Sequence, residues 1–328
     1  MSIQVAIHTT RRYEKFKTIV RIIKEEIARP EEVEFRHTPT EEDVRKIADQ
    51  IDILVCYTVP REAFEQADRL SWIHIGTAGI DHTSFPELLK SDVIVTNASG
   101  LHAEPASEFV MAQMLYFAKH IDEFRRFKES RQWNQWELAA KISLLDGKSI
   151  GIVGLGSIGK AIAKKARAFG MHVIATKYSV APEDQYAFVD RLLSREQLPA
   201  LLRESDFVVL TLPLTSETEG LIDQRAFYQM KSSTYLINIS RGPIVDENAL
   251  ILSLKQNRIA GAALDVFREE PLPENSPLFG MDNVLLSPHI SGNFPEYVEW
   301  ASRDFGKNLN RFLSGKRLKN IVNKERGY

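Results

Sequence analysis

A glycine-rich turn is the first stretch of this sequence whose residues could do chemistry. It follows an apolar run at 149–153, which we expect to be a buried strand, and precedes residues 160–169, whose apolar side chains recur at helical spacing. In such a GxGxxG turn the first glycine allows a tight bend, the second lets backbone approach a pyrophosphate, and the third lets the helix pack on the strand. The helix N-terminus adds unpaired N–H groups that attract the anion. The residues predicted to bind a dinucleotide here are Gly154, Gly156, Ser157, Ile158 and Gly159.

The end of the next strand bears on which dinucleotide binds. We expect this strand at 171–175, so that Lys177 lies just beyond it and faces the adenine ribose. NAD-specific sites place Asp or Glu there, because a carboxylate hydrogen-bonds the ribose hydroxyls and repels a 2′-phosphate. This chain has Lys177, Tyr178 and Ser179 instead, with no acid before Glu183. The sequence therefore predicts NADP as the preferred cofactor, with NAD possible. The alternative is that Lys177 is a solvated strand-end lysine that tolerates either cofactor.

Three further stretches carry charged or ionisable side chains where strands of the same sheet should end. They are residues 238–242, 264–271 and 287–292. Ligands of open α/β sheets bind beyond the carboxyl ends of the strands, so Arg241, Asp265, Glu270 and His289 should meet in one crevice. Taken singly, each has an ordinary alternative: Arg241 could be a surface charge, Glu270 an acidic cap and His289 a buried core residue.

The elements that must position these residues indicate two α/β domains. A chain of 328 residues exceeds the size at which single cores stop growing, about 250–300 residues. Residues 1–100 alternate strands and helices without a glycine motif, and a long apolar helix is expected at about 104–130. We predict two Rossmann-like domains with parallel sheets. A dinucleotide-binding domain, 101–292, would be inserted into a flavodoxin-like substrate domain, 1–100 and 293–328.

Composition excludes several classes of partner. Hydrophobic residues make up 44% and charged residues 26% of the chain, as in ordinary globular enzymes, and the net charge of −2 implies no nucleic-acid or membrane partner. The single cysteine, Cys56, excludes an internal disulfide and a Cys-rich metal site, and no HExxH or similar spacing occurs, so no metal is expected. The N-terminus lacks a secretion signal and no apolar run approaches the ~18 residues of a membrane span, which predicts a cytoplasmic protein.

Taken together, the motifs resemble the D-isomer-specific 2-hydroxyacid dehydrogenases, the glyoxylate and hydroxypyruvate reductases among them. The resemblance covers nearly the whole chain and includes GTAGIDH at 76–82, VTNASG at 95–100 and TLPLTSETEGLI at 211–222. It implies an enzyme that transfers a hydride between NAD(P)H and the carbonyl of a small 2-oxoacid to give a D-2-hydroxyacid.

The resemblance also implies roles for single residues. Arg241 would bind the substrate carboxylate through its planar fork. His289 would be the general acid that protonates the carbonyl oxygen, and Glu270 would hydrogen-bond His289. The backbone N–H groups of Ala78 and Gly79 would complete the carboxylate cradle.

Cofactor contacts follow from the same resemblance. Asp265, with backbone near Ile239, would hold the nicotinamide. The further cofactor-binding residues implied are Leu212, Pro213, Thr218, Ile239, Asp265 and Gly292. Arg268 stands where the family usually has an acid, but it lies outside the acid–base pair.

Other functions stay open at this point. A regulatory protein of the same fold could sense the dinucleotide without turnover, although it need not keep Arg241, Glu270 and His289. A dehydrogenase of formate, phosphite or a phosphorylated hydroxyacid is a second alternative, but no additional basic residues lie near Ala78. The identity of the 2-oxoacid is open. The apolar helix after Glu104, with two tryptophans at 133 and 136, suggests a homodimer.

Overall fold

The computed structural model describes residues 2–181 and 183–324, which form two compact units. One unit takes the chain up to Leu101 and again from Phe294 onward, and the other is His102–Asn293. The second unit is therefore inserted into the chain of the first. Each unit is a parallel-sheet α/β structure, and this confirms the predicted fold class.

The first unit is built on a five-stranded parallel sheet in the order β2-β1-β3-β4-β5. This is the flavodoxin-like strand order. The strands are β1 (Ile3–His8), β2 (Val33–His37), β3 (Ile53–Cys56), β4 (Trp72–Ile75) and β5 (Ile94–Asn97). The connecting helices are α1 (Tyr13–Glu26), α2 (Glu41–Arg45), α3 (Arg61–Phe64) and α4 (Pro86–Lys90). Alternate strand residues enter two separate apolar clusters, so both faces of this sheet are covered.

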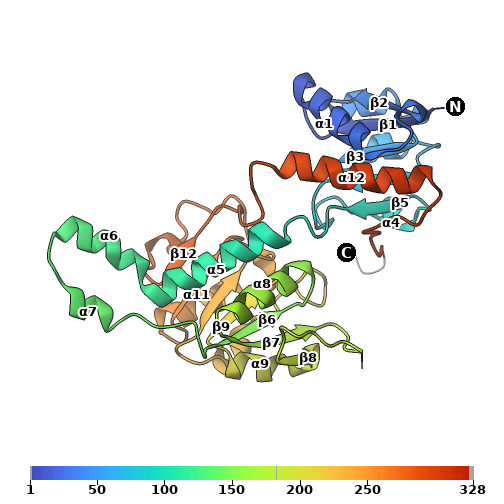
Figure 1. The fold of residues 1–328 in the computed structure, drawn as a ribbon. Helices are drawn as coiled ribbons and strands as arrows, with labels where there is room; N and C mark the ends of the chain where they lie inside the picture. The colour runs from blue at the N-terminus through green and yellow to red at the C-terminus, as the bar shows by residue number, and fades with distance from the viewer. Residues whose placement is uncertain (1, 182, 325–328) are drawn as a thin grey trace. The chain divides into compact units, whose positions relative to one another are not determined.

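The C-terminal helix, α12 (Tyr297–Leu313), belongs to this first unit and lies beside α1 (Figure 1). Its Phe305 is buried against Trp72 of β4, with ring centroids 5.1 Å apart. Arg303 of α12 donates to Glu26 of α1 at 2.9 Å. Apolar packing and this ion pair thus return the end of the chain to the sheet where it began.

The second unit is built on a seven-stranded parallel sheet in the order β12-β11-β10-β9-β6-β7-β8. If the strands of this unit are numbered from β6, the order read from the β8 edge is 3-2-1-4-5-6-7. The first six strands have the order of dinucleotide-binding sheets. The strands are β6 (Ser149–Val153), β7 (His172–Lys177), β8 (Arg191–Ser194), β9 (Phe207–Leu210), β10 (Tyr235–Asn238), β11 (Gly261–Leu264) and β12 (Val284–Leu286). The helices are α5 (Ala103–Lys119), α6 (Ile121–Ser130), α7 (Gln135–Ala139), α8 (Ser157–Ala168), α9 (Leu198–Glu204), α10 (Gln224–Gln229) and α11 (Glu247–Lys255).

The single helix predicted at 104–130 is wrong, because the chain breaks at His120. His120 has a φ of +49° and separates α5 from α6. A continuing helix would use the carbonyl of Ala118 for its own ladder, but this carbonyl accepts the N–H of Ser143 at 2.8 Å. α5 packs on α8, whereas α6 and α7 form an arm that projects from the unit (Figure 1).

The strand predicted at 171–175 also differs from the structure. β7 runs on to Lys177, which pairs in register with Ser194 of the unpredicted edge strand β8. Lys177 is therefore the last residue of the strand rather than a residue beyond it.

Within residues 2–181 and 183–324, no helix has the length and apolar character needed to cross a membrane.

Candidate active site

The turn between β6 and α8 has the backbone geometry that its glycines predict. Gly154 has a φ of +104°, and a Cβ there would lie 2.9 Å from the carbonyl oxygen of Thr211. A Cβ on Gly159 would lie 2.3 Å from the carbonyl oxygen of Gly154, whereas one on Gly156 would meet nothing within 4 Å. α8 begins at Ser157 without a side-chain cap, so its first N–H groups are available to an anion. Open space above Gly156 and an uncapped helix N-terminus fit a pyrophosphate.

Other predicted cofactor residues lie at neighbouring element ends. Ile158 is in the first turn of α8, and Ile239 follows β10 directly. Leu212 and Pro213 follow β9, and the hydroxyl of Thr218 donates to the carbonyl of Pro213 at 2.7 Å. The Thr218 hydroxyl therefore closes the turn after β9, a structural role beyond the predicted cofactor contact.

Lys177 is not an isolated cation. Its Nζ lies 2.6 Å from Oδ1 and 2.7 Å from Oδ2 of Asp184, which also accepts the N–H of Ala181 at 2.9 Å and the hydroxyl of Tyr186 at 3.1 Å. The hydrogen bond from Lys177 lowers the pKa of Asp184 to about 2, and the same bond raises the pKa of Lys177. Glu183 is the first acid after Lys177 in the sequence, whereas the partner in the structure is the next residue, Asp184.

Glu270 and His289, which the family resemblance pairs as base and acid, are in direct contact. Nδ1 of His289 lies 2.8 Å from Oε2 of Glu270, and Oε1 of Glu270 accepts the N–H of Phe267 at 3.0 Å. The imidazole is about half exposed, with 49% of its side chain accessible. Because Nδ1 faces Glu270, Nε2 is the nitrogen that remains for a proton exchange with a bound molecule.

Asp265 holds the loop that carries His289. It is fully buried, and its carboxylate accepts the Ser287 hydroxyl at 2.6 Å and the N–H groups of Ile290 and Ser291, both at 2.9 Å. A carboxylate has about four acceptor positions, and these three donors fill all but about one of them. The family resemblance implies only a cofactor role for Asp265. The loop-holding role depends on partners more than twenty residues away.

Arg241 lies at the end of β10, next to the strand that leads to Glu270. Its Nη1 donates to the carbonyl of Ser240 at 2.8 Å, and Asn238 Nδ2 donates to the carbonyl of Arg241 at 3.1 Å. A Cβ on Gly242 would lie 1.9 Å from the carbonyl of Phe267, so the two loops touch through their backbones. Since β10, β11 and β12 are neighbours, Arg241 and the acid–base pair occupy adjacent strand ends.

In the first unit, the loop 76–79 turns its carbonyl groups inward. Each of its four carbonyl oxygens accepts a hydrogen bond from the same unit. The donors are the Tyr297 hydroxyl to Gly76, Ala98 N to Thr77 at 3.0 Å, Asn97 Nδ2 to Ala78 at 2.6 Å and Thr77 Oγ1 to Gly79 at 2.8 Å. The N–H groups of Ala78 and Gly79 donate to no acceptor in the described part of the chain. Adjacent unused N–H groups can bind an anion, and Tyr297, which helps to hold this loop, was missed from the sequence.

Gly292 and two histidines near the predicted site residues have structural partners. Nδ1 of His102 lies 3.0 Å from the carbonyl oxygen of Gly292. A Cβ added to Gly292 would lie 2.7 Å from this nitrogen. Nε2 of His82 lies 2.9 Å from the carbonyl oxygen of Tyr57. Gly292, predicted to bind the cofactor, therefore packs against a histidine of its own unit.

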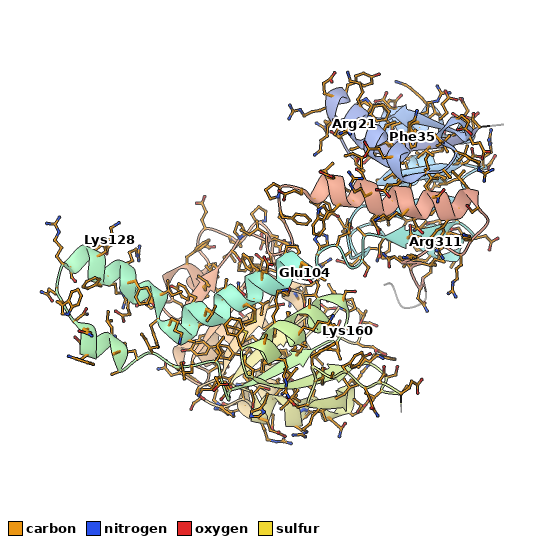
Figure 2. All side chains as sticks on the ribbon, in the orientation of Figure 1. Arg21, Phe35, Glu104, Lys128, Lys160 and Arg311 are labelled. Atoms are coloured by element: carbon orange, nitrogen blue, oxygen red, sulfur yellow. The ribbon has the colours of Figure 1, made fainter. Side chains whose placement is uncertain are left out.

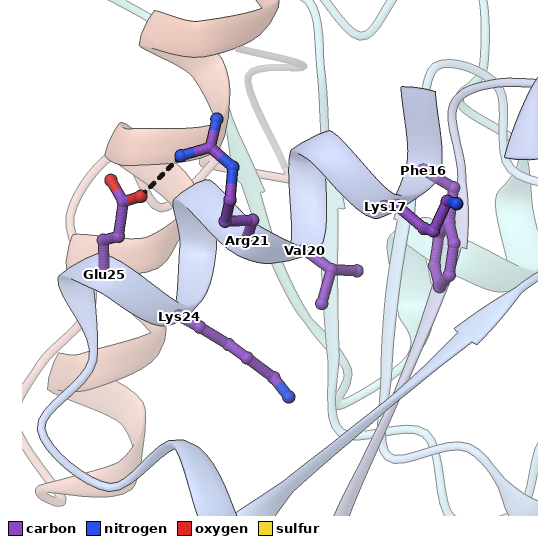
Figure 3. A pocket seen from close by; sticks show the side chains of 6 residues that line it. All are labelled: Phe16, Lys17, Val20, Arg21, Lys24 and Glu25. Atoms are coloured by element: carbon purple, nitrogen blue, oxygen red, sulfur yellow. Dashed lines mark hydrogen bonds and ion pairs between the residues drawn. The ribbon is translucent and has the colours of Figure 1, made fainter. Parts of the chain in front are cut away.

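A hollow on α1 contains none of the predicted site residues. It is lined by Phe16, Lys17, Val20, Arg21, Lys24 and Glu25 (Figure 3). Lys17 pairs with Glu14 at 2.7 Å, and Arg21 pairs with Glu25 at 2.7 Å. Figure 2 labels Arg21 and Phe35, and the ammonium of Lys24 lies 6.0 Å from the Phe35 ring. We assign no site to this hollow.

No group of three or more His, Cys, Asp or Glu residues in the described ranges could hold a metal ion.

Comparison with known proteins identifies relatives of this chain. The family model for the NAD-binding domain of D-isomer specific 2-hydroxyacid dehydrogenases matches residues 111–291. A glyoxylate reductase of Pyrococcus horikoshii is 38% identical over 290 residues, which cover 85% of this chain and 84% of the relative.

Solved structures with the same fold span the whole chain. A D-isomer specific 2-hydroxyacid dehydrogenase from Xanthobacter autotrophicus, in complex with NADPH and MES, has a TM-score of 0.85 and 27% identity and covers 100% of both chains. An NADPH-dependent glyoxylate/hydroxypyruvate reductase from Sinorhizobium meliloti, in complex with NADP and sulfate, has a TM-score of 0.81 and 25% identity, again over 100% of both chains.

Proposed function

This chain belongs to the D-isomer-specific 2-hydroxyacid dehydrogenase family. From that premise we propose that the enzyme reduces a small 2-oxoacid with NADPH as the hydride donor, and that Arg241, Glu270 and His289 are its catalytic residues. The enzyme is an NAD(P)-dependent oxidoreductase that transfers hydride between its cofactor and the carbonyl of a 2-oxoacid. The unit His102–Asn293 is proposed to bind the dinucleotide, and the other unit is proposed to contribute to substrate binding.

One observation carries the catalytic assignment. His289 is held by Glu270 at 2.8 Å, on a loop tied to β11, and it is half exposed although its partner is anchored to backbone. A core histidine would have both ring nitrogens buried. A half-exposed ring with one nitrogen fixed by a carboxylate is the arrangement of a general acid.

The residues of the chain would act as follows. The reduced nicotinamide, when bound, supplies the hydride to the carbonyl carbon. Nε2–H of His289 donates its proton to the carbonyl oxygen, which becomes the hydroxyl, while Glu270 stabilises the ring at Nδ1. In the reverse reaction Nε2 accepts the hydroxyl proton. The Arg241 guanidinium binds the carboxylate by a bidentate contact, and the N–H groups of Ala78 and Gly79 are proposed as further carboxylate donors.

Glyoxylate and hydroxypyruvate are the proposed substrates, because relatives and structural neighbours are named for them. The test is turnover with a panel of 2-oxoacids, formate, phosphite and a phosphorylated hydroxyacid, with NADPH or NADP as each requires. Glyoxylate gives an achiral product, so the handedness must be read from hydroxypyruvate, where we expect the D-hydroxyacid. Absence of turnover with every compound, together with micromolar dinucleotide binding, would favour the regulatory alternative.

NADPH is the proposed preferred cofactor, with NADH accepted more weakly. Lys177 ends β7, at the position where dinucleotide-binding sheets contact the adenine ribose, and a cation there favours a 2′-phosphate. A hydrogen bond to a charged group contributes about 1.5–3 kcal/mol, which corresponds to roughly a ten- to hundredfold preference in kcat/KM. Lys177→Asp should reverse the preference, and rising salt should weaken it. Equal kcat/KM for the two cofactors at low salt would exclude it.

A homodimer is proposed, with the α6–α7 arm in the interface. α6 has no buried residue, and Trp133 and Trp136 are 81% and 80% exposed. Exposed apolar patches of this kind mark interaction surfaces. A stable monomer at micromolar concentration in sedimentation would exclude the homodimer.

The predicted cytoplasmic location also stays a proposal, which cell fractionation with an antibody to the chain would test.

A further inference from the structure

Lys177 shares its charge with Asp184, and this pair lies at the cofactor end of β7. Both oxygens of Asp184 contact the ammonium, at 2.6 and 2.7 Å. An ammonium has three donors, so this contact uses most of its capacity. Only 12% of the Asp184 side chain and 34% of the Lys177 side chain are accessible. The pair is therefore more than a transient surface contact.

Asp184 is held in place by the chain between β7 and β8. The N–H of Ala181 donates to Oδ2 at 2.9 Å, and the hydroxyl of Tyr186 donates to Oδ1 at 3.1 Å. The Tyr186 ring lies in turn under the ammonium of Lys160, 4.7 Å from Nζ (Figure 2 labels Lys160 on α8). These contacts link the carboxylate to the same helix whose N-terminus is proposed to bind the pyrophosphate. Its position is thus fixed relative to the cofactor-binding turn.

We propose that Asp184 is a specificity-determining residue that lowers the preference for NADPH by competing with its 2′-phosphate for Lys177. This inference rests on the proposed cofactor site at Lys177. A 2′-phosphate that reaches Nζ must displace or approach a carboxylate, and two anions at that distance repel each other. NADH places only neutral hydroxyls there, so it does not meet this repulsion. The acid typical of NAD-specific sites is then supplied from the loop, seven residues after the strand ends.

The test is the dissociation constants of NADP and NAD, measured by calorimetry on the full chain and its variants. Asp184→Asn keeps the shape and the oxygen that accepts from Ala181 but removes the charge. We expect NADP to bind about tenfold more tightly to this variant, while the constant for NAD changes less than about threefold. Glu183→Gln is the matched control, because it removes the same charge from the neighbouring residue, whose side chain has no partner in the described ranges. It should leave both constants within about twofold.

Two further variants separate this inference from the cofactor site on which it rests. Lys177→Gln should weaken the binding of NADP but not that of NAD. If the ratio of the two dissociation constants does not change, Lys177 is not the phosphate ligand. In the double variant Lys177→Gln/Asp184→Asn, the gain from Asp184→Asn should vanish. If Lys177→Gln lowers NADP affinity but Asp184→Asn leaves the ratio unchanged, the inference about Asp184 is wrong while the cofactor site stands. A loss of NAD binding in Asp184→Asn would also overturn it, because Asp184 would then be a direct ribose ligand.

Discussion

Glu270 uses its two carboxylate oxygens for two different tasks: Oε1 accepts the backbone N–H of Phe267 at 3.0 Å, and Oε2 contacts Nδ1 of His289 at 2.8 Å. The backbone bond fixes the carboxylate, and the fixed carboxylate fixes the tautomer and direction of the imidazole. Glu270→Gln keeps the shape but loses the charge, so we expect kcat to fall about tenfold or more, with cofactor affinity unchanged. A variant that keeps full kcat would show that His289 does not depend on Glu270.

His289 itself should be required for proton transfer. We expect His289→Ala to lower kcat by ~10²–10⁴-fold, because the carbonyl oxygen then lacks its acid. Dinucleotide binding, measured by fluorescence titration, should stay near that of the unmodified enzyme. If the variant retains more than about a tenth of kcat, His289 is not the acid.

Arg241→Lys tests whether the substrate carboxylate is bound by a planar fork. A lysine keeps the positive charge but cannot make the bidentate contact, so KM for the 2-oxoacid should rise and kcat/KM should fall. The KM for NADPH serves as the internal control and should not change. Unchanged 2-oxoacid kinetics would remove Arg241 from the site.

The parts predicted from the sequence are those that short-range chemistry determines. β6 and the glycine turn are local features: an apolar run gives the strand, and Gly154 must adopt a positive φ. The family, the fold class and the 2-oxoacid reductase activity are also confirmed. The roles of single site residues stay predictions.

Features that depend on distant partners could not be predicted in this way. The break at His120 involves the N–H of Ser143, which donates a hydrogen bond to the carbonyl of Ala118 in α5. The pairing of Lys177 with Asp184 depends on how the loop after β7 folds back. Hydropathy and spacing along the sequence carry no signal for such contacts.

Tyr297 should position the loop that presents the N–H groups of Ala78 and Gly79. Its hydroxyl donates to the carbonyl of Gly76 from a position 221 residues away in the chain. Tyr297→Phe removes only this donor, so we expect the 2-oxoacid KM to rise several-fold while cofactor affinity is unchanged. A merely structural role would lower the melting temperature without this selective effect on KM, so both are to be measured. Tyr228→Phe, at an exposed tyrosine of the other unit, is the control.

His74 gives a prediction for stability against pH. It is buried in β4, and this burial lowers its pKa to about 4. Nδ1 lies 2.9 Å from Oγ1 of Thr96, which accepts the indole N–H of Trp72 at 2.8 Å, so the neutral ring can accept the Thr96 proton. In the unfolded chain a histidine titrates near ~6.5.

The sign of the effect follows from these two values. Above about pH 6.5 the ring is neutral in both states, so its protonation costs the folded state nothing. As pH falls toward about 4, only the unfolded chain binds the proton, and the folded state loses about 1.4 kcal/mol per pH unit, or about 3 kcal/mol in total. His74→Gln should lack this contribution. Urea unfolding of both proteins at pH 7 and near pH 4 measures it, and carboxylate titration cancels in the difference. Parallel losses of stability in the two proteins would show that His74 is protonated in the fold.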